Sequence, residues 1–111
     1  MTPFEIQYDL YKGDRDDYEQ LYKRLERLNA VRVTESTWVV ASASNADQIR
    51  DYLAKFMHPD DVLSVNVLAV GQGYAWRNLS RAAAAWMAEH LKAWRIGIRN
   101  TAPKRIGIRK P

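Results

Sequence analysis

Asp9 is the residue of this 111-residue chain whose type and position most suggest chemistry. It ends a short stretch of alternating apolar and polar residues, just before a predicted turn at Lys12-Gly13. A carboxylate there can bind Mg²⁺, a hard cation that takes one or two carboxylates, keeps several waters and activates water beside a phosphodiester. One aspartate per chain suffices only if dimerisation brings two together. The alternative is that Asp9 caps the following turn or accepts backbone hydrogen bonds there.

Other candidate catalytic or metal-binding groups are weaker. Asp60-Asp61 follows His58-Pro59, where aspartates usually bond their own turn. The spacing of His58 and His90 matches no metal motif, and Gly71-Gln72-Gly73 lacks the third glycine and the Lys-Ser/Thr of phosphate-binding loops. The chain has no cysteine, which excludes disulfides and thiolate chemistry.

The positive charge of the chain is concentrated in its last 17 residues, 95–111. Taking those six charges from the overall +4 leaves −2 for residues 1–94. Such a segment predicts salt-sensitive, largely sequence-independent binding of RNA or DNA through phosphates. The alternatives are a solubilising tail, or an added strand that pairs with the sheet edge of a protein partner. The six cations, which have no acid among them, are Arg95, Arg99, Lys104, Arg105, Arg109 and Lys110.

The same tail contains the sequence Arg-Ile-Gly-Ile-Arg twice, at Arg95–Arg99 and Arg105–Arg109. The alternation of Arg and Ile is compatible with strand pairing, and the segment could equally be disordered without a partner. Aromatic residues elsewhere suggest a second route to RNA, by stacking on bases from an open sheet face. The alternative for them is burial in a core or a dimer interface. These aromatic residues are Tyr8, Tyr11, Trp38, Tyr74 and Trp76.

The first half of the chain predicts a strand, a helix and a hairpin. Phe4, Ile6 and Tyr8 recur with a period of two and indicate one buried face of a strand. Apolar residues spaced by three and four predict an amphipathic helix over about 14–29, with Asp14 as its N-cap and Asn29 as its left-handed C-cap. β-Branched and aromatic residues over 31–34 and 37–41 then predict two strands joined by a turn at Glu35-Ser36.

The second half predicts another helix and strand before the chain changes character. Ser44 is the expected N-cap of a helix over about 45–57, which ends at His58-Pro59. The nearly continuous apolar run 62–70 predicts a central strand of the sheet. An alanine-rich helix capped by Ser80 follows and ends near Trp94.

The element order predicts a ferredoxin-like α+β sandwich, βαββαβ, with an appended C-terminal helix and a basic tail. Right-handed crossovers would place both sandwich helices on one face of an antiparallel sheet. We expect a domain over 1–79, the appended helix over 80–94 and the tail over 95–111. No signal-peptide pattern or membrane-length apolar run is present, so a cytoplasmic protein without a membrane partner is expected.

Four segments together resemble a known family. In order, they are Tyr8-Asp9-Leu10, Ser36-Thr37-Trp38-Val39-Val40, Ala46-x-x-Ile49-Arg50-x-x-Leu53 and Asp60-Asp61-x-Leu63. Their order and spacing resemble the small ferredoxin-like proteins that include the CRISPR-associated Cas2 proteins and the VapD toxins, and are most similar to the SinR-like branch. The resemblance covers residues 4–79 and leaves out the appended helix and the tail.

The resemblance implies a homodimer built by packing two sheets. In the nuclease members, the aspartate that ends the first strand meets its symmetry mate and holds a divalent metal, and Asp9 matches that position. Three functions follow: a dimeric nucleic-acid-binding or regulatory protein that is not catalytic, a Mg²⁺-dependent ribonuclease or endonuclease that uses paired Asp9 carboxylates, or a protein-interaction module from a phage or mobile element. The first is the prediction, and the other two are its alternatives.

Overall fold

The computed structural model describes residues 1–11 and 18–91 of the chain. These residues belong to two compact units, the first spanning Met1–Leu68 and the second beginning at Ala69. Each unit is described by itself. Among the described helices, none combines the length and the apolar character that crossing a membrane requires.

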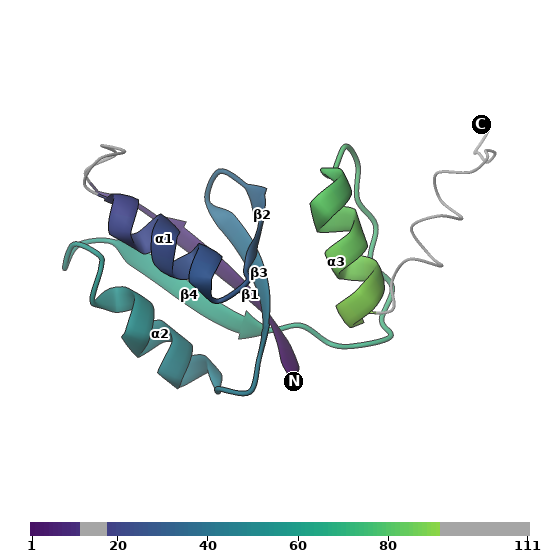
Figure 1. Ribbon diagram of the computed structural model, residues 1–111, viewed down its shortest axis with the longest axis horizontal. Helices are drawn as coiled ribbons and strands as arrows, with labels where there is room; N and C mark the ends of the chain where they lie inside the picture. The colour runs from purple at the N-terminus through teal and green to yellow at the C-terminus, as the bar shows by residue number, and fades with distance from the viewer. Residues whose placement is uncertain (12–17, 92–111) are drawn as a thin grey trace. The chain divides into compact units, whose positions relative to one another are not determined.

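The first unit is an α+β unit built on one antiparallel sheet (Figure 1). Its elements follow along the chain as strand, helix, two strands, helix and strand. The sheet has four strands in the order β2-β3-β1-β4, which makes β1 and β3 its inner strands. The elements are β1 (Thr2–Asp9), α1 (Glu19–Arg27), β2 (Val31–Thr34), β3 (Thr37–Ser42), α2 (Ala46–Ala54) and β4 (Val62–Val67).

Helices α1 and α2 cover the same face of the sheet, as predicted (Figure 1). The alternation of β1 sends its apolar side chains into this core and leaves Asp9 on the opposite face, exposed. Trp38 of β3 lies opposite Ile6 of β1 and joins the same core. The two helices contribute leucines and an isoleucine spaced by four residues. The buried cluster is Phe4, Ile6, Tyr8, Tyr18, Leu21, Leu25, Trp38, Val40, Ile49 and Leu53.

Helix α1 is shorter than the sequence pattern predicts. It begins at Glu19 after Tyr18, whose side chain makes no capping hydrogen bond. The predicted N-cap, Asp14, lies outside the described residues. The predicted end is confirmed, since Asn29 has a φ of 62° and its N–H donates to the Glu26 carbonyl over 3.0 Å. A left-handed residue after the last turn satisfies carbonyls that would otherwise lack donors.

Helix α2 is capped by Asn45, so the prediction of Ser44 was wrong by one residue. The Asn45 side chain accepts the Gln48 backbone N–H over 2.9 Å, and the Gln48 side chain accepts the Asn45 N–H over 2.9 Å. This reciprocal capping box satisfies two helix-end donors at once. Ser44 instead donates its N–H to the Ser42 hydroxyl over 3.1 Å, which places it before the helix.

Strand β4 lies at an edge of the sheet, so its prediction as a central strand was wrong. Its uncharged sequence is typical of a strand with neighbours on both sides, yet among the described residues β1 alone pairs with it. Leu63 and Val65 pack against the core, whereas the side chains of Val62 and Val67 are 61% and 62% exposed. The opposite edge, β2, has an irregular register between Arg32 and Thr34.

The second unit contains α3 (Arg81–Leu91). As predicted, the Ser80 hydroxyl caps this helix by accepting the Ala83 N–H over 3.1 Å. At the other end, the Gly71 N–H donates to the Leu91 carbonyl over 2.9 Å. Gly71 has a φ of 81°, which suits glycine because it lacks a Cβ. The predicted end of the helix near Trp94 lies outside the described residues.

Candidate functional site

Asp9 is an exposed carboxylate at the end of β1. It lies opposite Val62 of β4, on the face of the sheet away from α1 and α2. Among residues 1–11 and 18–91, it accepts no hydrogen bond and forms no ion pair. The alternative that Asp9 is a turn cap therefore has no bond to support it in this part of the chain.

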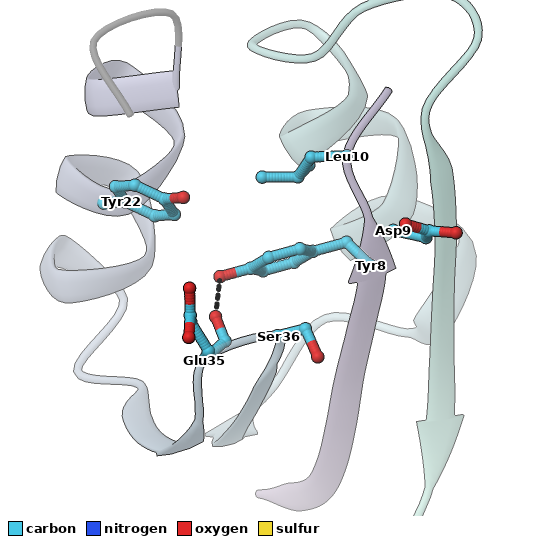
Figure 2. A pocket seen from close by; sticks show the side chains of 6 residues that line it. All are labelled: Tyr8, Asp9, Leu10, Tyr22, Glu35 and Ser36. Atoms are coloured by element: carbon cyan, nitrogen blue, oxygen red, sulfur yellow. Dashed lines mark hydrogen bonds between the residues drawn. The ribbon is translucent and has the colours of Figure 1, made fainter. Parts of the chain in front are cut away.

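Two shallow hollows meet at Asp9. The larger, of about 550 Å³, is open to solvent and lies between β1, α1 and the β2–β3 turn (Figure 2). The smaller, of about 270 Å³, lies toward β4 and includes Gln7, Val62 and Ser64. The larger hollow is lined by Tyr8, Asp9, Leu10, Tyr22, Glu35 and Ser36.

The two carboxylates that border the larger hollow do not converge. Figure 2 shows the Tyr8 ring pointing toward Tyr22 and Glu35, while the Asp9 side chain points the other way, toward β4. Successive residues of a strand project to opposite faces, so Tyr8 and Asp9 must diverge in this way. Asp9 and Glu35 consequently lie on opposite sides of β1, and they do not form a shared binding site for one ion within the chain.

Tyr8 has a structural role in the core. Its hydroxyl accepts the indole N–H of Trp38 over 2.9 Å and donates to the Glu35 carbonyl over 3.0 Å. Burial raises the pKa of Tyr8 above its ordinary value of 10.0, although the Trp38 hydrogen bond and the charge of Arg32 act in the opposite direction. Because Tyr8 and Trp38 are both buried, the predicted stacking of bases on these two rings was wrong.

The other aromatic residues of that prediction do not form a surface for stacking bases either. Tyr11 is 67% exposed, and its ring stacks on the imidazole of His58 with centroids 5.1 Å apart. Tyr74 and Trp76 belong to the second unit, and the Tyr74 hydroxyl donates to the Ala69 carbonyl over 2.8 Å. The described residues of each unit therefore offer no row of open rings.

Arg32 is a cation that the sequence reading did not single out. Its guanidinium carbon lies 4.9 Å from the Tyr22 ring centroid and 5.3 Å from that of Trp38, and it donates to the Glu35 carbonyl over 2.6 Å. Such stacking is favourable because the face of an aromatic ring is electronegative. The alternation of Val31, Arg32 and Val33 assigns Arg32 to the face opposite the two valines, and only the register of β2 on β3 shows that Trp38 lies on the same face.

Asp61 confirms the predicted bonding role of the Asp60-Asp61 turn and extends it. Its carboxylate accepts the backbone N–H groups of Tyr11 and His58 and the hydroxyl of Tyr18. Burial raises the pKa of Asp61, but these three hydrogen bonds outweigh it and hold the pKa below its ordinary value of 3.8. This one side chain joins the end of β1, the start of α1 and the turn before β4.

The remaining candidate groups do not assemble a metal centre within the described residues. The imidazole of His58 lies 3.8 Å from the Asp60 carboxylate, and that of His90 lies beside the Trp86 ring. No cluster of three or more histidines and acids suited to a metal ion occurs over 1–11 and 18–91. A metal at Asp9 would thus take its other ligands from outside this part of the chain.

All six tail cations lie outside the described residues, so their binding role stays a prediction. The two Arg-Ile-Gly-Ile-Arg copies lie there as well. A search of protein-family models found none that matches the chain.

Proposed function

We propose that the chain is a small dimeric nucleic-acid-binding or regulatory protein, in which the tail 95–111 contacts the phosphate backbone and Asp9 is not catalytic. In this proposal the first unit is a ferredoxin-like domain of the Cas2/VapD type. Support for that assignment comes from the strand order and from the placement of both helices on one face of the sheet. It is also the arrangement that the resemblance implies.

The segregation of charge carries the proposal. Residues 95–111 hold six positive charges and no negative one, whereas residues 1–94 have a net charge of −2. A weakly acidic body is repelled by a polyanion, so phosphate contacts should concentrate in the tail. Seventeen residues with this charge density can neutralise several phosphates, which gives affinity without base recognition.

The surroundings of Asp9 support a non-catalytic reading. Nearby Glu35 lies on the opposite side of β1 and cannot complete a metal site with it (Figure 2). Exposed side chains next to Asp9 in the smaller hollow are neutral. A phosphate approaching Asp9 would meet a negative charge with no cation among the residues that line the hollow.

Fluorescence anisotropy can measure the binding of labelled single-stranded RNA and duplex DNA at increasing salt concentration. This measurement tests the proposal. Replacing four tail arginines by glutamine should weaken binding strongly and reduce the slope of log K against log salt by about 3. The matched control replaces four exposed cations of the body in the same way. Equal losses in the two variants, or no loss in the tail variant, would refute the proposal. The tail set is Arg95, Arg99, Arg105 and Arg109, and the body set is Lys23, Arg27, Arg50 and Lys55.

A second candidate function is a Mg²⁺-dependent nuclease that pairs Asp9 with its symmetry mate. The observation in its favour is that Asp9 is exposed and has no partner among the described residues, unlike Asp61. Carboxylate oxygens are the protein ligands that Mg²⁺ prefers, and the bound ion would activate water for attack on the phosphodiester. Incubation with labelled RNA or DNA and Mg²⁺ or Mn²⁺ tests this function. Cleavage that Asp9→Asn leaves intact, or that EDTA does not stop, would exclude it.

A further inference from the structure

Among the described residues, strand β4 pairs on one side only and presents its other hydrogen-bonding edge. The Leu68 N–H donates to the Pro3 carbonyl over 2.9 Å, which fixes the side of the strand that bonds β1. Because residues of an antiparallel pair alternate in bonding direction, Asn66 and Ser64 also bond toward β1. The residues between them direct their backbone N–H and C=O groups off the sheet. These outward-bonding residues are Leu63, Val65 and Val67.

This edge lacks the devices that block unwanted strand pairing. Proteins protect edges with charged side chains, proline, bulges or short strands. Edge strand β2 uses three of them, since it has four residues, carries Arg32 and is irregular in register. Strand β4 has six residues, none of them charged or proline, and the valines at its two ends are more than 60% exposed. The contrast between the two edges indicates that β4 is built to be covered.

We infer that β4 pairs antiparallel with β4 of a second copy of this chain, around a two-fold axis at Val65. Centred there, Val65 meets its own copy, and the outward groups of Leu63 bond those of Val67 of the partner subunit. On the other face, Ser64 meets Asn66 of the partner subunit and Val62 meets Leu68. Apolar side chains thus face apolar ones, and the two polar side chains face each other.

Neighbouring registers lose this complementarity. A two-fold axis at Ser64 sets Val62 against Asn66, and an axis at Asn66 sets Ser64 against Leu68. Each also makes fewer ladder hydrogen bonds, because one of the three outward-bonding residues is then left opposite a residue outside the strand. The sequence of β4 therefore selects one self-pairing register, with no like charges brought together across the axis.

The pairing joins two four-stranded sheets into one continuous sheet, and it fixes where Asp9 lies. Asp9 is opposite Val62, three positions from Val65 and one strand further from the axis. With usual strand spacings, the two Asp9 Cα atoms are about 25 Å apart. That separation is too long for one ion to bind both carboxylates. The inference rests on the dimer of the proposed function, but it joins the two sheets at their edges where the resemblance implies packing of one sheet on the other. It also conflicts with the paired-Asp9 nuclease.

Disulfide trapping tests the register, on a chain that has no cysteine of its own. Ser64→Cys and Asn66→Cys are made as separate full-length variants, checked for folding by circular dichroism, mixed, allowed to exchange and oxidised. In the inferred register, Ser64 and Asn66 of the partner subunit have Cα atoms about 4.5 Å apart, which a disulfide can span. The mixture should give a covalent dimer of one copy of each variant, containing up to about half of the chains.

Each variant oxidised alone is the matched control. In this register, position 64 lies about 8 Å from position 64 of the partner subunit, and the same holds for position 66, too far for a disulfide. Cross-linking of the mixture but of neither variant alone is the expected result. Cross-linking within either single variant, or none in the mixture, would overturn the inferred register.

Light scattering on the full-length chain measures its oligomeric state and tests the β4 edge as the dimer interface independently. The unsubstituted protein should be a dimer, and Val67→Lys should raise the dimer dissociation constant at least tenfold by setting a charge against Leu63 of the partner subunit. Val70→Lys, at a 49% exposed valine outside β4, should leave the dimer intact. A monomeric protein, or a dimer that Val67→Lys does not weaken, would overturn the inference. Binding of nucleic acid by the tail is measured separately, so a dimer that Val67→Lys does not weaken overturns this inference and leaves the proposed function standing.

Discussion

The indole N–H of Trp38 donates to the phenolic oxygen of Tyr8 over 2.9 Å, inside the core and between neighbouring strands. Tyr8 in turn donates to the Glu35 carbonyl in the turn that joins β2 and β3. The pair links the inner strands of the sheet to the end of the hairpin. Tyr8 is therefore a structural residue of the core, whereas its neighbour Asp9 is exposed.

Tyr8→Phe should destabilise the protein by about 1–3 kcal/mol, because the buried Trp38 N–H loses its acceptor. Urea denaturation followed by circular dichroism measures the free energy of unfolding. Tyr22→Phe is the control, since the Tyr22 hydroxyl makes no hydrogen bond among the described residues, and it should change stability by less than about 0.5 kcal/mol. Equal effects of the two substitutions would contradict this account of Tyr8.

Asp61→Asn should destabilise the protein by about 1–2 kcal/mol at neutral pH, because three donors lose a charged acceptor. Since the pKa of Asp61 is lower in the folded chain than in the unfolded one, its stabilisation is present above the unfolded pKa. It is lost as the pH falls below about 4 through the folded pKa. The free energy of unfolding should therefore fall less steeply with acid in Asp61→Asn than in the parent. Parallel curves would show that Asp61 does not contribute through its charge.

Asp9→Asn should leave stability within about 0.5 kcal/mol of the parent, because Asp9 is exposed and has no bonding partner in the described part of the chain. Thermal unfolding of Asp9→Asn beside Asp61→Asn provides the comparison between two aspartates of opposite surroundings. A large loss for Asp9→Asn would indicate a structural contact of this carboxylate. Added Mg²⁺ should also leave the melting temperature unchanged, since one unpaired carboxylate gives no strong site.

Asn45→Ala should destabilise the protein by about 1 kcal/mol, because it removes the acceptor that caps α2. Ser44→Ala tests the residue that the sequence pattern favours instead, and it should cost less than about 0.5 kcal/mol. Chemical denaturation of both variants decides between the two caps. The reverse ranking would mean that the helix begins one residue earlier than Asn45 indicates.

The sequence predicts the elements of the first unit well because periodicity reports the faces that each element buries. The alternation of Phe4, Ile6 and Tyr8, and the spacing of Leu21 and Leu25, correctly identify one core under two helices. Periodicity does not report which strands are neighbours. An uncharged strand such as β4 therefore resembled a central strand although it lies at an edge.

The candidate site is predictable only in part, for a similar reason. That Asp9 faces away from the core follows from its place in β1. Two other features depend on tertiary arrangement. Glu35 lies on the other side of the strand, and Asp61 accepts hydrogen bonds from residues 43 and 50 positions away. Arg32 carries a charge that sequence reasoning assigns to solvent, yet its flat guanidinium packs on two rings.

The irregularity of β2 between Arg32 and Thr34 limits how many copies of the chain can join edge to edge. A sheet with two open edges would add copies without end and form fibres, because each added copy exposes another edge. Here the β2 edge is blocked by its irregular register and by the charge of Arg32, so pairing at β4 uses the other edge of the described sheet. Any assembly built this way stops at two members, and concentrated solutions of the protein should remain free of filaments.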